Sequence, residues 1–188
     1  MCAKGSSASG SHKIDIGAGG HRSYVKEIKL TQGQVTQVSD HRFENLNQYK
    51  WQAAWDKKNQ CYYVQRGEWL GMVNGKRKMR IIKMAREILG LKHGDKRKGD
   101  HKDHNTLNNQ DYNLRIAKND SESNANRRLR SDSTTGYKGV QPRGKRYVAS
   151  IKKDGKQKYL GTRDTPEEAS SLYWAAAQEM HVGFACIA

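Results

Sequence analysis

Short runs of alternating hydrophobic and polar residues dominate the first half of the chain, and they predict a region rich in β-strands. Tyr24–Leu30 and Gln34–Val38 alternate on either side of Gly33, which predicts a hairpin. In Asp40–Trp55 the apolar spacing favours a helical turn first and the start of a strand at its end. Cys61–Arg66 (CYYVQR) is typical of a further strand.

A second hairpin and a helix are predicted next. Met72–Val73 and Lys76–Met79 flank an Asn74-Gly75 pair, and Asn-Gly is strongly preferred in two-residue hairpin turns. Ile81–Leu91 (IIKMAREILGL) has a helical period that ends at a glycine. The first half of the chain is therefore expected to hold several strands and short helices.

The last quarter of the chain predicts three strands followed by one helix. The strands are expected at residues 137–141, 146–152 and 156–162. The helix begins after Asp164, because Thr165 can cap it and Pro166 suits its first position. Its apolar residues repeat at helical spacing, so we expect it to pack on the three-stranded sheet.

The charge of the chain indicates a polyanionic partner. Lys and Arg outnumber Asp and Glu by 35 to 19, which gives a net charge of +16. Ten Lys or Arg lie between Lys76 and Lys98, and residues 127–163 hold twelve, each span against two acidic residues. No apolar run is long enough to span a membrane, so double-stranded DNA is expected rather than lipid. The candidate phosphate contacts in these runs include Lys76, Arg77, Lys78, Arg80, Arg127 and Arg128.

The cysteines bear on whether the protein has disulfides or a zinc site, and on its cellular compartment. There are three, with no CxxC pair, so neither a disulfide framework nor a structural zinc site is predicted. Free thiols suit a reducing compartment, and no secretory signal is present. We expect a cytoplasmic protein, placed in the host nucleoid if a phage encodes it.

One polar segment carries the sharpest chemical signal. Asp100–Arg115 fits the pattern DH-x-x-x-N-x-L-x-N-x-x-x-N-L-R. This pattern resembles the HNH endonucleases of phages and mobile elements, and the wider resemblance runs from about Ile28 to Asn126. The resemblance implies that His101 is the general base and that Asp100 binds a divalent metal ion. It also implies that Asn113 holds the loop and orients the base. Oxygen ligands of this kind favour Mg²⁺ or Mn²⁺ over zinc.

The resemblance leaves the remaining metal ligand open. Relatives supply it from the helix after the Leu-Arg pair, and simple counting reaches Glu122. The stretch here is one residue longer, so Ser123 or Asn124 can also take that place; Asn124 has the residue type of the family. Ala85 stands where relatives carry a histidine. His104 is interpreted as a loop residue.

The C-terminal segment resembles a second family, the AP2 DNA-binding domain. The match rests on Gly136-Tyr137-Lys138-Gly139-Val140, on Tyr159-Leu160-Gly161-Thr162, and on the helix that opens at Asp164. The resemblance implies a three-stranded sheet that enters the major groove. By position, it implies DNA contacts from Lys138, Lys152, Tyr159 and Thr162, and the intervening turn adds Arg143 and Arg146.

These interpretations predict an α+β protein made of small modules. A hydrophobic share of 35% fits several small cores better than one large core. We expect a flexible tail at 1–22 and an HNH nuclease region with a β-rich N-terminal part and a ββα-metal core at 23–126. A linker at 127–135 and an AP2-like domain at 136–188 follow, the latter a three-stranded antiparallel sheet on one helix.

The predicted function is metal-dependent hydrolysis of DNA, by a site-specific homing nickase. We expect it to act as a monomer, without an obligatory protein partner and without a membrane. The alternative is an inactive AP2-type DNA-binding regulator, which Ala85 and the unsettled third ligand favour. An RNA-binding protein is a third hypothesis, against which the AP2 resemblance argues.

Overall fold

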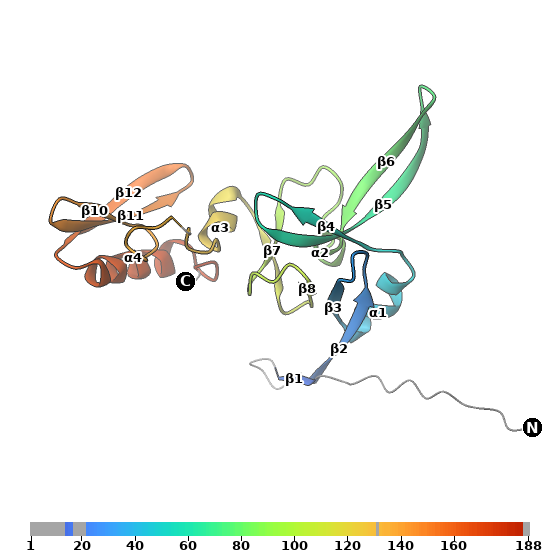
Figure 1. Cartoon of the computed structure of the whole chain (residues 1–188), viewed down its shortest axis with the longest axis horizontal. Helices are drawn as coiled ribbons and strands as arrows, with labels where there is room; N and C mark the ends of the chain where they lie inside the picture. Colours follow the sequence, from blue (N-terminus) through green and yellow to red (C-terminus); the bar gives the residue numbers. More distant parts are fainter. Residues whose placement is uncertain (1–13, 17–21, 131, 186–188) are drawn as a thin grey trace, which may run out of the picture. The chain divides into compact units, whose positions relative to one another are not determined.

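The computed structural model describes residues 14–16, 22–130 and 132–185, and its fold is mixed α+β (Figure 1). The chain divides into two compact units. The first consists of Met1–Gly90 with Asn105–Leu114, and the second of Leu91–His104 with Arg115–Ala188. No helix of the described ranges is both long and apolar enough to cross a membrane.

One sheet of the first unit has the strand order β1-β2-β3-β8. Its strands are β1 (Ile14–Ile16), β2 (Arg22–Lys29), β3 (Val35–Ser39) and β8 (Asn108–Asn109). The β2–β3 pairing confirms the predicted first hairpin. The short strand β1 lies inside the segment predicted to be a tail, whose residues 1–13 and 17–21 are outside the described part. Strand β8 was not predicted, and it joins β3 in parallel.

The other sheet of the first unit contains a long hairpin. Its strands are β4 (Gln52–Asp56), β5 (Cys61–Val73) and β6 (Lys76–Lys83). Figure 1 shows β5 and β6 extending well beyond β4. The predicted turn at Asn74-Gly75 is confirmed, with both residues at positive φ. The predicted helix start at Ile81 is wrong, because residues 81–83 still pair with β5 and helix α2 (Met84–Ile88) begins only after them.

The core of the first unit forms where both sheets meet two short helices. Helix α1 (Asp40–Asn47) contributes Leu46, whose carbonyl oxygen accepts a 2.8 Å hydrogen bond from the buried indole of Trp51. Leu114 reaches the same core from the far end of the polar segment. The buried members are Ile28, Val38, Leu46, Trp51, Val64, Met84, Ile88 and Leu114.

The second unit begins with a small ββ pair and a helix. Strand β7 (Lys98–His101) pairs with β9 (Leu114–Ala117), whose first residue belongs to the first unit. Helix α3 (Asp120–Ala125) follows β9 after two residues.

The rest of the second unit is a three-stranded antiparallel sheet packed on one helix. Its strands are β10 (Val140–Arg143), β11 (Arg146–Lys153) and β12 (Lys156–Arg163), and its helix is α4 (Pro166–Met180). Ala149 and Ile151 of β11 lie in hydrophobic clusters with residues of α4. Thr165 caps α4 as predicted, accepting a 3.3 Å hydrogen bond from the backbone N–H of Glu168.

Strand β10 begins at Val140, three residues later than predicted, because Gly139 breaks the strand geometry. Gly139 has φ +71°, and its carbonyl accepts a 2.9 Å hydrogen bond from Ser150 N–H. A Cβ at this position would lie 2.1 Å from a ring carbon of Tyr173. The glycine therefore lets the chain lie directly against the ring.

We expect Gly139→Ala to lower the free energy of unfolding by roughly 2–4 kcal/mol, through left-handed strain and overpacking together. Gly144→Ala is the matched control, since Gly144 also has positive φ but a Cβ there would meet nothing within 4 Å. The control should lose only about 1–2 kcal/mol. Denaturant unfolding followed by circular dichroism measures both, and equal losses would show that the contact with Tyr173 contributes nothing.

Candidate active site and basic surfaces

The candidate active site lies at the end of strand β7. Asp100 and His101 are the last two residues of this strand, and the α3 segment lies within hydrogen-bonding distance of them. Both are well shielded, with the Asp100 side chain 13% exposed and His101 buried. The predicted metal ligand and the predicted base are therefore neighbours in a protected place.

Asn126 holds these two residues. It is the C-cap of helix α3 and only 4% exposed. Its Nδ2 lies 3.0 and 3.2 Å from the two carboxylate oxygens of Asp100, and it donates to the carbonyl oxygen of His101 at 2.9 Å. An amide nitrogen has two hydrogens, so one can serve the carboxylate and the other the carbonyl.

Arg115 balances the charge of Asp100. Its Nε donates to Asp100 Oδ2 at 2.7 Å, and its side chain is 15% exposed. The guanidinium also lies 4.1 Å from the ring centroid of Phe184 and donates to the carbonyl oxygen of Gly183. The carboxylate is thus paired within the protein itself.

Of the three sequence candidates for the third ligand, Glu122 and Asn124 make other contacts. Glu122 accepts a 2.7 Å hydrogen bond from the backbone N–H of Lys118, while its own N–H donates to Asn119 Oδ1 at 2.9 Å. Its carboxylate therefore serves in a cap at the start of α3. Asn124 is exposed and lines a hollow with Lys152 and other residues.

Asn126 was missed by the sequence reasoning. Counting along an assumed helix ended at residue 124, whereas the helix stops at Ala125 and the contact comes from the cap residue. A signal existed, because Asn126 has the residue type expected for the ligand and lies four positions after Glu122. Whether the chain caps at that point depends on backbone geometry that the motif does not encode.

The donor set at Asp100 suits a hard divalent cation. A carboxylate and a carboxamide supply oxygen ligands, and Mg²⁺ commonly takes one or two protein oxygens and completes its shell with water and substrate phosphate. The Oδ1 of Asn126 accepts no hydrogen bond within the described residues. In that same part of the chain, no group of three or more His, Cys, Asp or Glu side chains is arranged for a metal. The residues present therefore fit a site that substrate completes.

His104 supports the Asn126 backbone. Its Nδ1 accepts a 3.2 Å hydrogen bond from Arg128 Nε, so its Nε2 can donate to the carbonyl oxygen of Asn126. His104 has φ +64°, a left-handed conformation that such contacts help to maintain. Arg128, a predicted DNA contact, thus also belongs to this hydrogen-bond chain. The other predicted contact beside it, Arg127, is exposed.

The loop that contains Asn113 belongs to the first unit. Asn113 is buried, and its Nδ2 donates to the carbonyl oxygen of Asn108 at 2.8 Å. Asp111 fixes the same loop through a 2.8 Å ion pair with Arg42. Burial acts to raise the pKa of Asp111, but hydrogen bonds from Arg42 and Ser39 outweigh it, so the pKa lies below its ordinary value. The loop is thus held by paired polar groups.

Most predicted AP2-like contact residues share one face of the β10–β11–β12 sheet. Successive side chains of β11 point to opposite faces of the sheet. Ala149 and Ile151 are buried against α4, so the residues that alternate with them along β11 face away from α4. Cross-strand pairs place Gln141 and Thr162 opposite Val148 on that outer face. The predicted contacts on the outer face are Arg143, Arg146, Lys152, Tyr159 and Thr162.

Several of these side chains already have partners. Tyr159 and Thr162 share a 2.7 Å hydrogen bond, and Arg146 forms an exposed ion pair with Asp164 at 2.7 Å. Lys138 lies off the strands, and its ammonium donates to the carbonyl oxygens of Ala125 and Arg127 at 2.6 and 2.7 Å. Lys138 therefore supports the C-terminal end of α3 in this structure.

The remaining predicted DNA contacts lie on strand β6. Arg80 pairs with Glu68 across the hairpin. Lys76, Arg77 and Lys78 are exposed near the tip, and no ion pair links them to any described residue.

The chain thus carries a shielded polar site at Asp100 and His101, and two exposed cationic surfaces, one on β6 and one on the β10–β11–β12 sheet. Ala85, where a histidine was expected, packs against the core of the first unit. Comparisons of the chain with protein-family models, with curated proteins and with solved structures find no match.

Proposed function

We propose that this protein is a DNA endonuclease of the HNH type, with a ββα-metal core at β7, β9 and α3. The observation that carries the proposal is the Asn126 carboxamide holding both Asp100 and His101. It joins the Asp100 carboxylate to the backbone of a buried histidine, in a chain with a net charge of +16. A general base beside a cation site on a strongly basic protein suits hydrolysis of a phosphodiester.

His101 has the role of general base in this proposal. Its imidazole takes a proton from a water molecule as the water oxygen bonds to phosphorus and one phosphorus–oxygen ester bond breaks. The departing oxygen takes up a proton from solvent water, which leaves a phosphate end and a hydroxyl end. Histidine is the side chain whose charge ordinarily changes nearest to neutral pH, which suits it to proton transfer in a cell. Asn126 fixes the backbone of the base, and Asn113 holds the loop that follows it.

Asp100 and Asn126 are the residues that would hold Mg²⁺ or Mn²⁺. A bound cation of this kind stabilises negative charge on the phosphate and the leaving oxygen. Arg115 would then share the Asp100 carboxylate with the cation. Arg115 and Asn126 together fix the position of the Asp100 carboxylate.

The cationic surfaces supply the DNA binding in this proposal. The outer face of the β10–β11–β12 sheet offers arginines together with Tyr159 and Thr162, a combination that can contact both phosphates and base edges. This arrangement supports an AP2-like role for the segment. A homing nickase that acts as a monomer accounts for one candidate site in each chain.

We expect the wild-type protein to convert supercoiled plasmid to the relaxed form with Mg²⁺ or Mn²⁺, and His101→Ala to slow this conversion by about 10²–10⁴-fold through loss of the base. His93→Ala is the matched control, because His93 is an exposed histidine of the same unit. Cutting that persists in His101→Ala at the wild-type rate would remove His101 from the mechanism.

We expect Asn126→Ala to raise the Mn²⁺ concentration needed for half-maximal nicking by about 10–100-fold, the range found when groups that orient metal ligands are lost. Asn124→Ala and Glu122→Gln should leave this concentration unchanged, because the Glu122 carboxylate accepts from Lys118 N–H and Asn124 is an exposed side chain. Circular dichroism checks that each variant is folded. A large effect of Glu122→Gln with none of Asn126→Ala would transfer the ligand role to Glu122.

The alternative function is an inactive DNA-binding regulator. Two observations favour it: Arg115 already neutralises Asp100, and Ala85 replaces an expected histidine. The plasmid assay separates the two functions when it is paired with a gel shift on duplex DNA. DNA binding without relaxation in either metal would establish the regulator in place of the nuclease.

A further inference from the structure

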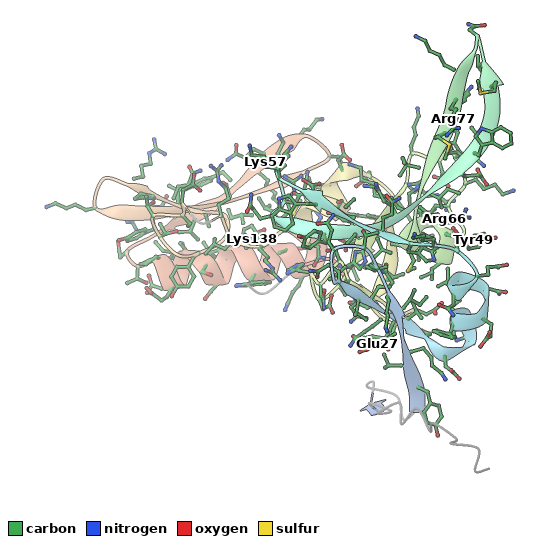
Figure 2. All side chains as sticks on the ribbon, turned by 45° about the vertical axis from the view of Figure 1, so that its right-hand side comes forward. Glu27, Tyr49, Lys57, Arg66, Arg77 and Lys138 are labelled. Carbon is green, nitrogen blue, oxygen red and sulfur yellow. The ribbon has the colours of Figure 1, made fainter. Side chains whose placement is uncertain are left out.

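The β5–β6 hairpin has a fixed base and an exposed distal part. At the base, Arg66 forms a 3.1 Å ion pair with Glu87 and lies 3.9 Å from the ring centroid of Tyr49 (Figure 2). Farther out, Glu68 and Arg80 pair across the two strands. Beyond these contacts the hairpin continues to the Asn74-Gly75 turn, and Figure 2 shows Arg77 on this outer stretch. We call residues 67–82 the arm.

The two faces of the arm differ in character. Trp69 pairs with Met79, Gly67 with Ile81, and Met72 with Arg77. Because directly paired residues share a face and alternate residues of a strand do too, one face gathers the large apolar side chains. A bulge between Trp69 and Met72 keeps Met72 on that face. Its apolar members are Trp69, Met72, Met79 and Ile81, which are 65%, 58%, 51% and 57% exposed.

The opposite face is charged and cationic. It carries Lys76, Lys78 and Arg80, with Glu68 as its acidic residue, and one exposed apolar residue, Val73, which pairs with Lys76. Leu70 is also exposed and lies within the bulge. Across residues 65–83 there are six Lys or Arg against that one acid. Clustered exposed apolar side chains mark an interaction site, and the surrounding cations indicate that the partner is an anion.

We propose that the arm lies in the minor groove of duplex DNA, with its apolar face against the groove. This inference rests on the proposed function as a DNA-binding enzyme. Minor-groove proteins insert apolar side chains such as Met and Ile between base steps, whereas base reading in the major groove rests mainly on hydrogen-bonding side chains. Arg77 is the one cation on the apolar face, and an arginine suits the negative potential of a narrow minor groove.

Charge also favours DNA over a second copy of the chain as the partner of the apolar face. Pairing two arms through their apolar faces would bring together two segments that each carry the excess of cations described above. It would also unite two chains of net charge +16. DNA instead offers phosphates on the rims of the groove, which the long side chains of Lys76 and Lys78 can reach around the edge of strand β6. The apolar face and the charges are then satisfied by the same partner.

The arm contributes affinity and bending rather than base selection. Among its groove-facing side chains, only Arg77 and the indole N–H of Trp69 can hydrogen-bond to base edges. It therefore responds to the width and deformability of the groove.

The test measures binding of a labelled A·T-rich duplex by fluorescence anisotropy, in EDTA so that no cutting occurs. We expect the Trp69→Ala/Met79→Ser double variant to bind at least about tenfold more weakly, given the apolar area lost. Netropsin, which fills the A·T minor groove, should weaken binding by the wild type more than binding by this variant. Trp55→Ala is the matched control, since Trp55 is a half-exposed tryptophan of the same unit outside the arm, and it should bind like the wild type.

A second variant tests the charges. Replacing Lys76, Arg77 and Lys78 by alanine should reduce the slope of log affinity against log salt by about 2–3, since each phosphate contact contributes about 0.9. Unchanged affinity in the double variant, or no effect of netropsin on the wild type, overturns the arm proposal while leaving the endonuclease intact.

The remaining outcomes are also decisive. A wild-type dimer in sedimentation that the double variant converts to monomer would assign the apolar face to self-association and overturn the proposal. If the wild type binds no duplex at all and relaxes no plasmid, the proposed function itself fails. Thermal unfolding of each variant confirms that these exposed substitutions leave the fold intact.

Discussion

The geometry at the end of β7 depends on one carboxamide, that of Asn126. It joins the cap of α3 to the side chain of Asp100 and to the backbone of His101. A carboxylate with so little exposure needs hydrogen-bond donors, because burying a charge without them is costly. Asn126 and Arg115 supply those donors together, while His104 holds the Asn126 carbonyl in turn. Residues from three segments of the chain thus fix one another.

This arrangement separates the charge of the site from the charge of the surface. The surface is strongly cationic, whereas Asp100 keeps a single negative charge behind Arg115. Arg115 donates one hydrogen bond to the Asp100 carboxylate from Nε, while its Nη1 donates to the Gly183 carbonyl oxygen, so the guanidinium is fixed at both ends. Phosphates can therefore be drawn to the chain without losing the one acidic group that hydrolysis would require.

Much of the fold could be predicted from local sequence signals, because turns and caps act over a few residues. Asn74-Gly75 predicted the hairpin at its tip, and Thr165-Pro166 predicted the start of α4. What failed depended on contacts between distant residues. Ile81 and Ile82 have a helical spacing with Met84, yet pairing with β5 keeps them extended. Strand β8 is too short for a pattern and exists only because β3 lies beside it.

In the candidate site, too, local sequence signals predicted some residues, and contacts between distant residues determine the others. Asp100, His101 and Asn113 follow from a motif with fixed spacing, and the structure places the first two side by side in a shielded position. Asn126 follows from where α3 ends, which the motif does not encode. Lys138 was predicted as a DNA contact from its position in a pattern. Its carbonyl partners are Ala125 in α3 and Arg127 at the start of the predicted linker, and no pattern within 136–188 could indicate them.

The two cationic surfaces are chemically different, and that difference bears on how a long DNA site could be recognised. The outer face of the β10–β11–β12 sheet presents hydroxyls and guanidinium groups, which can distinguish base pairs through hydrogen bonds. The arm presents indole, thioether and alkyl groups, which respond to shape. A protein with only the first kind of surface would select sequence but gain little energy from deforming the duplex. In the proposed endonuclease, the selection of bases and the distortion of the groove would be carried by separate elements, so a substitution in one would leave the contribution of the other in place.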